Sequence, residues 1–143
     1  MAEQNYKNHA KFVPMFHFVL FGLIVISLLA SIYNLFRHIH ERFRLTAGLE
    51  VLIAFSLLML FFFTRTFAMK VQDRAIRAEE NLRHFALTGK LLDRRLTIKQ
   101  IVGLRFASDQ EFVALAQQAA GQGTSMDDIK KSVKNWRADH DRA

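Results

Sequence analysis

Two long apolar runs, separated by a short charged segment, dominate the first half of the chain. Residues 15–36 carry no formal charge, and residues 51–63 are apolar except for one serine. About 20 apolar residues are enough for a helix to cross a hydrocarbon core ~30 Å thick. The pattern therefore predicts an all-α fold built on a two-span transmembrane helical hairpin. We place its spans at about 14–36 and 46–68 and its turn in residues 37–44.

The second span shows no helix breaker where it should leave the membrane. No Gly or Pro occurs between Leu49 and Phe85, and Gly89 is the first residue typical of a helix C-terminus. At ~1.5 Å per residue this uninterrupted helix would be about 60 Å long. The second span is thus predicted to begin at Thr46 as N-cap and to continue as a long cytoplasmic helix over residues 70–89.

The predicted juxtamembrane helix carries an apolar seam. Its residues follow one another at alternating spacings of three and four, the heptad pattern of helix pairs, and are Ala68, Val71, Ala75, Ala78, Leu82 and Phe85. Asp73 with Arg77, and Glu79 with Arg83, form acid-before-base pairs at the i,i+4 spacing that stabilises a helix. The seam predicts a helix–helix contact on this side of the helix.

Two partners for the seam stay open. In a parallel pair of identical helices, Arg74 and Glu79 would occupy the positions that form interhelical salt bridges. Alternatively, the chain's own later helices cover the seam, and the small number of heptads favours this second interpretation. The covering helices would be those that hold Phe106, Phe112 and Trp136. In both cases Ile76 and Glu80 are expected to point outward, away from the seam.

Residues 90–143 predict three short helices. Hydroxyl residues that can cap a helix precede each of them, namely Thr97, Ser108 and Ser125, and the last two form capping boxes with Glu111 and Asp128. The apolar faces of the last two helices are Phe112, Val113, Leu115, Ala116, Ala119 and Ala120, and Met126, Ile129, Val133 and Trp136. The predicted organisation is a transmembrane hairpin at 1–69, a juxtamembrane helix at 70–89 and a cytoplasmic helical region at 90–143.

Basic charge is concentrated just after the second span. The 143 residues carry a net charge of +7, with ten basic and four acidic side chains in residues 65–105 but five basic and six acidic in residues 106–143. A basic residue near a membrane surface attracts anionic headgroups by ~1 kcal/mol. Membrane lipids are therefore expected partners, and the residues expected to contact their headgroups are Arg65, Lys70, Arg74 and Arg77.

The orientation of the hairpin follows from the same charges. More basic residues flank the outer ends of the two spans than the loop, which holds three arginines, so the positive-inside rule places both termini in the cytoplasm. A cleaved signal peptide is the alternative for the first run. That run is longer than a usual ~7–15-residue h-region, and no small-x-small cleavage site follows it. We therefore expect a multi-pass protein of a bacterial inner membrane.

A few polar side chains interrupt the two spans. The candidates for intramembrane packing are Ser27, Ser31, Asn34 and Glu50. The two serines form a small-xxx-small pair, which permits close approach of helices in lipid. A carboxylate in a span invites a functional interpretation. Because this one lies near the end of the span, an interfacial ion pair with Arg37 or Arg44 is favoured instead.

The sequence offers no recognisable catalytic set. It contains no nucleophile elbow, Walker loop or dinucleotide fingerprint, and it has no cysteine for a disulfide, a thiolate metal site or a nucleophile. His38 and His40 would point apart on a helix, and His17 as a haem ligand would need a histidine that the second span lacks. We therefore expect no catalytic residue, no metal, no cofactor and no enzymatic activity.

Three segments resemble a bacterial family known only as a domain of unknown function. They are RTFAMKVQDRAIRAEENLR at residues 65–83, LRFASDQEF at 104–112 and QNYKNH at 4–9. The similarity covers essentially the whole chain. The resemblance implies a small two-span integral membrane protein and implies no activity.

Two classes of function remain. The first is a non-enzymatic membrane protein that acts as a scaffold, an anchor or an accessory subunit, with a membrane-protein partner or a second copy of itself. The second is a membrane-tethered regulator that binds nucleic acid or another cytoplasmic ligand through a helix–turn–helix-like region at 112–136. Its basic residues would be Lys130, Lys131, Lys134 and Arg137. The net negative charge of residues 106–143 disfavours nucleic acid, which requires a basic footprint.

Overall fold

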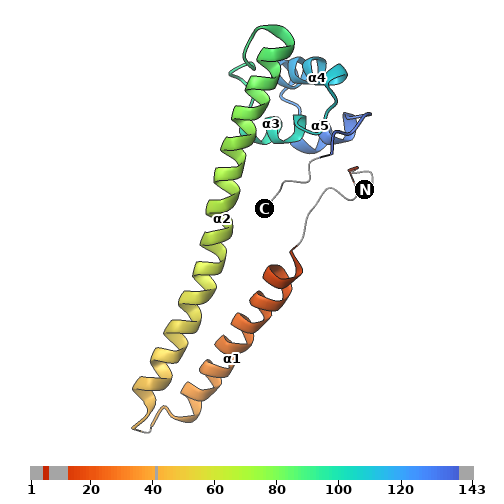
Figure 1. Ribbon diagram of the computed structural model, residues 1–143. Helices are drawn as coiled ribbons and strands as arrows, with labels where there is room; N and C mark the ends of the chain where they lie inside the picture. The colour runs from red at the N-terminus through yellow and green to blue at the C-terminus, as the bar shows by residue number, and fades with distance from the viewer. Residues whose placement is uncertain (1–4, 7–12, 41, 139–143) are drawn as a thin grey trace. The chain divides into compact units, whose positions relative to one another are not determined.

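The computed structural model describes residues 5–6, 13–40 and 42–138. In chain order its helices are the π-helix η1 (Met15–Leu20), α1 (Phe21–Arg37), α2 (Arg44–Thr88), α3 (Ile98–Leu104), α4 (Asp109–Gln122) and α5 (Met126–Ser132) (Figure 1). The all-helical fold class is confirmed for these residues. The chain divides into two compact units, a hairpin unit of residues 12–67 and a C-terminal unit of residues 68–143 together with residues 1–11. Helix α2 contributes to both units.

The hairpin unit pairs η1 and α1 with the first half of α2. The ring of Phe16 stacks on that of Phe61 with centroids 4.5 Å apart, and Asn34 donates a 2.9 Å hydrogen bond to Glu50. An early residue of the first span thus meets a late residue of the second, so the two helices run antiparallel. Both helices are long and apolar enough to cross a membrane, and only 11% of the apolar window of each is buried. A core helix of a soluble protein would instead be covered by its own chain.

Both spans begin differently from the prediction. The first turns after Pro14 form a π-helix rather than an α-helix. Thr46 is not the N-cap of α2, because the helix already begins at Arg44 and Ala47 donates its backbone N–H to the carbonyl of Phe43 at 3.0 Å. The physical reason is that Arg44 and the leucine after it are both good helix formers, so nothing opposes two more residues of helix.

Helix α2 is uninterrupted over its 45 residues, as the absence of Gly and Pro between Leu49 and Phe85 predicted. It ends where expected: Gly89 adopts φ +71°, and its N–H donates to the carbonyl of Phe85 at 2.7 Å. A left-handed residue just past the last turn is favourable for glycine because it has no Cβ. Beyond Gly89 the chain turns back along α2, and the backbone N–H of Leu92 donates a hydrogen bond to the side chain of Asn81.

The C-terminal unit has a core formed by α3, α4, α5 and one side of α2 (Figure 1). Its buried apolar side chains include Ile76, Leu92, Leu96, Ile101, Leu104, Phe106, Phe112, Ala116, Ala119, Ile129 and Val133. The predicted caps at Thr97 and Ser125 are confirmed, since each side chain accepts the N–H three residues on. Gly103 lets α3 approach α5 closely: a Cβ there would lie 3.1 Å from the carbonyl oxygen of Met126.

The last helix is shorter than its apolar spacing predicted. Helix α5 ends at Ser132, and Val133 is extended. The carboxylate of Glu111 accepts the backbone N–H groups of Lys134 and Asn135 at 3.2 and 2.9 Å, which takes the donors that a longer helix would use internally. Trp136 instead pairs with Ala107 in an isolated antiparallel bridge. The capping box at Ser108 is also incomplete: α4 begins there as expected, but the serine side chain accepts no cap bond.

The later helices pack on the side of α2 opposite the seam, so the second of the two interpretations, in which they cover the seam, is wrong. The seam residues Ala68, Val71, Ala75, Ala78, Leu82 and Phe85 are all exposed, with Val71 at 67% and Leu82 at 68%. The buried residues are Ile76, Glu80 and His84; the first two lie away from the seam, as predicted, but they are covered by the C-terminal unit rather than facing outward. The physical reason is that Glu80 and His84 find polar partners in the C-terminal unit, and this allows a largely polar face to be buried.

Candidate functional site

Two clusters of polar side chains are built into apolar surroundings, one in each unit. In the hairpin unit, Asn34 on α1 donates its side-chain N–H to Glu50 on α2. The bond replaces the ion pair expected with Arg37 or Arg44, because among the described residues Glu50 forms no salt bridge. Ser31 is buried and donates its hydroxyl to the carbonyl of Leu28 at 2.9 Å.

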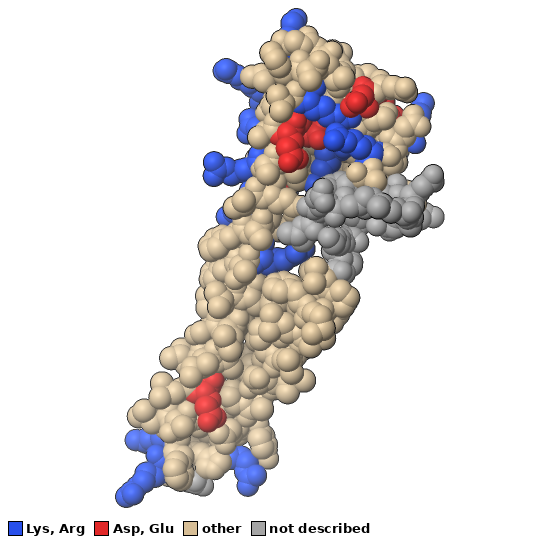
Figure 2. Space-filling view, in the orientation of Figure 1, with Lys and Arg blue, Asp and Glu red and all other residues tan. Residues whose placement is uncertain are grey.

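The Asn34–Glu50 pair lies between two pockets of the hairpin unit. The larger, of about 570 Å³, is lined by Ser27, Ala30, Ser31, Asn34, Glu50, Ile53, Ala54 and Leu57. The smaller, of about 200 Å³, is lined by Asn34, His38, Phe43, Thr46, Ala47 and Glu50. The structure thus brings together all four residues predicted for intramembrane packing. We call this set of Ser27, Ser31, Asn34 and Glu50 the polar groove. On the face of the hairpin unit that Figure 2 shows, few charged side chains lie beyond those at the loop.

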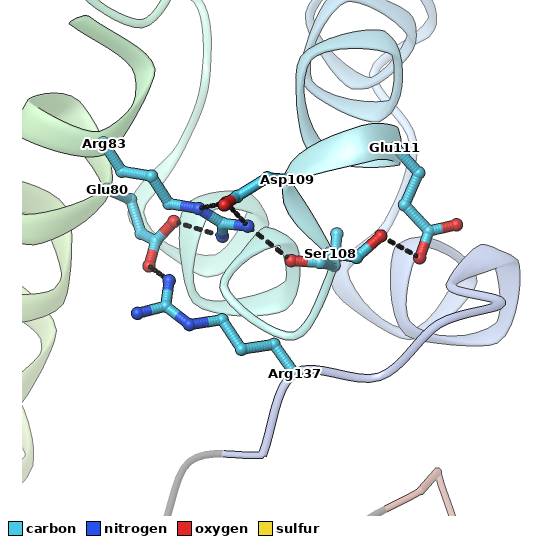
Figure 3. A network of polar contacts seen from close by, with 7 residues as sticks. Glu80, Arg83, Ser108, Asp109, Glu111 and Arg137 are labelled. Atoms are coloured by element: carbon cyan, nitrogen blue, oxygen red, sulfur yellow. Dashed lines mark hydrogen bonds and ion pairs between the residues drawn. The ribbon is translucent and has the colours of Figure 1, made fainter. Parts of the chain in front are cut away.

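Arg83 is the centre of the second cluster, on the buried face of α2 (Figure 3). Its Nη1 donates to Glu80 at 3.1 Å, its Nε donates to Asp109 at 2.7 Å, and its Nη2 donates to the carbonyl of Ala107 at 2.7 Å. Its guanidinium also lies 4.3 Å from the ring centroid of Phe112. One side chain therefore connects α2 to the start of α4. The i,i+4 pair with Glu79 that the sequence predicted is not formed.

Glu80 is the most buried carboxylate of this network. Only 5% of the residue is exposed, and burial raises the pKa of its carboxyl, against the opposing effect of Arg83 and Arg137. Arg137 lies 4.0 Å away, at the outer edge of an ion pair. A buried carboxylate in low dielectric is stable only with such partners, so Glu80 ties the segment after α5 to α2.

His84 completes the buried face of α2. Its Nδ1 lies 2.7 Å from the carbonyl oxygen of Lys90, and because a carbonyl only accepts, this nitrogen carries the proton. Its ring also contacts that of Phe112 edge to face. Sequence reasoning missed these roles. The available signal was a stripe of polar residues at positions 80, 83 and 84, opposite the apolar seam.

Glu111 holds the segment that follows α5. Desolvation opposes its ionisation, but the backbone N–H groups of Asn135 and Lys134 outweigh it and hold the pKa of the Glu111 carboxyl below its usual range. The hydroxyl of Ser108 adds a long contact of 3.4 Å to the same carboxylate. This acid, predicted as part of a capping box, is in fact an anchor for the loop.

The basic residues lie in two groups, one on α2 and one on and after α5. Lys70, Arg74 and Arg77 are exposed on α2, while Arg65 is half-buried. On the last helix, Lys130 is buried, and its ammonium lies 5.8 Å from the ring centroid of Phe106. The ammonium of Lys131 lies 5.7 Å from the ring centroid of Tyr6. Lys134 and Arg137 follow the end of α5. The four basic residues of the helix–turn–helix hypothesis therefore do not share one helix face.

Two histidines of the hairpin unit, His17 and His38, are turned toward backbone carbonyls. Nδ1 of His17 lies 3.0 Å from the carbonyl of Val13, and Nδ1 of His38 lies 3.0 Å from that of Asn34. Within the part of the chain that the structure describes, no group of three or more His, Asp or Glu side chains is arranged to hold a metal ion.

Comparison with known proteins assigns a family and no activity. A family model described as a family of unknown function (DUF6526) matches residues 1–143. No curated protein and no solved structure matches the chain.

Proposed function

Since the chain belongs to this family of unknown function, we propose its role from its geometry: a non-enzymatic, two-span membrane protein that serves as a scaffold, anchor or accessory subunit of a larger membrane assembly. Its hairpin would insert in the membrane and its C-terminal helical unit would stand in the cytoplasm. For a bacterial protein the membrane would be the inner one.

The polar groove of the hairpin carries this proposal. Glu50 lies six residues into α2, about 9 Å along the helix at ~1.5 Å per residue. Within a membrane span, a carboxylate and an amide are costly without polar partners and mark functional contacts. Asn34 satisfies only part of the hydrogen-bonding capacity of Glu50. A neighbouring span with a polar or basic side chain would satisfy the rest.

Purification of the tagged, full-length chain in mild detergent tests the proposal. We expect stoichiometric membrane proteins to co-purify with the natural sequence and to be lost with Glu50→Leu and Asn34→Leu. Ser56→Leu is the matched control, because Ser56 is an exposed polar residue that bonds only to its own helix, at the carbonyl of Leu52. Co-purification unaffected by the groove variants would contradict the proposal, and co-purifying nucleic acid would favour the regulator instead.

Reporter fusions test the orientation separately. A fusion at Ala143 should report the cytoplasm, and one within residues 38–42 should report the periplasm. The exposed Lys70, Arg74 and Arg77 support this orientation, because they would then face the anionic inner leaflet. A periplasmic Ala143 fusion would overturn both the orientation and the headgroup contact.

A further inference from the structure

The seam of α2 is an apolar surface that the described residues of the C-terminal unit leave exposed. Its large residues Val71, Leu82 and Phe85 are 67%, 68% and 51% exposed. Ala75 and Ala78 lie between them and Ala68 lies just before Val71, and these small side chains allow another helix backbone to approach closely. A contiguous apolar stripe of this kind on the surface indicates an interaction site.

The chain's own helices cannot be the partner in this fold. They already pack on the opposite face of α2, around Ile76, Glu80 and His84. On a helix with 100° per residue, position 80 lies about 180° from position 71. Cover of the seam by the same helices would require the Arg83 network to break.

Charges beside the seam point to a second copy of the same helix. With Ala75 and Leu82 at a, and Val71 and Ala78 at d, Arg74 occupies a g position and Glu79 the following e position. Both side chains are exposed, and neither forms an ion pair with another described residue. In a parallel pair in register, Arg74 of each helix meets Glu79 of the other, so the two-fold axis produces the salt bridge twice.

We propose that the protein forms a homodimer through a parallel pairing of the seams of two α2 helices. The inference rests on the proposed membrane insertion, because copies inserted with the same orientation present α2 in parallel. The dimer leaves each C-terminal unit on the outer side of its own helix. It also leaves the polar groove outside the pairing residues, which all lie in 68–85.

Cysteine cross-linking in native membranes tests the dimer, since the chain has no cysteine of its own. Ala75→Cys and Ala78→Cys lie in the seam, and Lys70→Cys and Arg77→Cys are exposed controls on the side of α2. Ile76 and Glu80 are unsuitable controls because the C-terminal unit buries them. We expect roughly fivefold more disulfide-linked dimer at the seam positions than at the controls, because a and d residues face each other across the pair.

A charge exchange then separates this dimer from any other contact of the seam. In the Ala78→Cys background, Arg74→Glu or Glu79→Arg alone should lower cross-linking roughly three- to tenfold, and the two together should restore it. Equal cross-linking at seam and control sites, failure of the double exchange to restore it, or linkage to a different protein would each overturn the dimer. Membrane fractionation of the same samples reports insertion, so failure of the dimer is distinguishable from failure of the proposed function.

Discussion

Beyond residue 67, one face of α2 consists of Ala, Val, Leu and Phe side chains and is exposed, whereas the opposite face holds Glu80 and His84 and is buried. Composition alone would predict that the apolar face is buried and that the face with Glu80 and His84 is exposed. The difference lies in the partners available within the chain. Glu80 and His84 are satisfied by Arg83 and by the carbonyl of Lys90, while the seam has neither a polar nor an apolar partner in the described C-terminal unit.

An apolar stripe on a helix thus indicates where an interface lies, but it does not identify the partner that covers it. A buried polar group is stable when its hydrogen bonds are made, and this condition depends on residues far away in the sequence, such as Asp109. A hydrophobic stripe carries no such condition, so it remains available for another chain.

The largest expected effect contrasts two phenylalanines. Phe112→Ala should lower the free energy of unfolding of the C-terminal unit by ~3–5 kcal/mol, because the ring is fully buried against Arg83 and His84. Phe85→Ala, on the half-exposed seam, should change it by less than about 0.5 kcal/mol in the monomer. Urea unfolding followed by the fluorescence of Trp136 measures both. Equal losses would mean that the C-terminal helices also cover the seam.

Removal of the central arginine should have the next largest effect. Arg83→Met should cost ~2–3 kcal/mol, because charge-assisted hydrogen bonds are lost and Glu80 stays buried with only the distant Arg137. Glu80→Gln combined with Arg83→Met should cost less than the sum of the single changes, since no buried charge is then stranded. Arg77→Met, at an exposed site on the same helix, is the control and should be close to neutral. Strict additivity would show that Glu80 and Arg83 are not coupled.

The smallest expected effect is a pair of opposite pH dependences. Burial raises the folded-state pKa of Glu80, so its contribution to stability is fully present below the unfolded pKa and is lost as the pH rises through the folded value. Backbone donors lower the pKa of Glu111, so its contribution is present above the unfolded pKa and is lost as the pH falls. The advantage of the natural sequence over Glu80→Gln should therefore shrink with rising pH, and its advantage over Glu111→Gln should grow. Unfolding free energies across the carboxyl range measure both, and slopes of the same sign would contradict the assignment.

Much of the fold follows from local pattern in the sequence. The continuous α2, its end at Gly89 and the caps at Thr97 and Ser125 depend on residues a few positions apart, and all were predictable. The polar groove residues were also identifiable, because polar side chains in an apolar span are conspicuous.

What failed depends on contacts between distant residues. The end of α5 is set by Glu111, more than twenty residues earlier in the chain. The buried face of α2 is set by Asp109 and by the carbonyl of Ala107, which helix periodicity does not reveal. In the hairpin unit, Glu50 likewise pairs with Asn34, sixteen residues earlier in the chain, instead of with Arg37 or Arg44.

The most direct test of the two-faced α2 compares two adjacent residues. Ala75 is exposed on the seam and Ile76 is buried on the opposite face. Single cysteines at these positions can be labelled with a maleimide in the monomer fraction in detergent, with the unfolded chain as reference for each site. We expect Ala75→Cys to be labelled at close to the unfolded rate and Ile76→Cys at least about tenfold more slowly, because labelling at the buried position requires local opening. Protection of Ala75→Cys with rapid labelling of Ile76→Cys would show that the C-terminal unit packs on the seam, and would contradict the two-faced packing of α2.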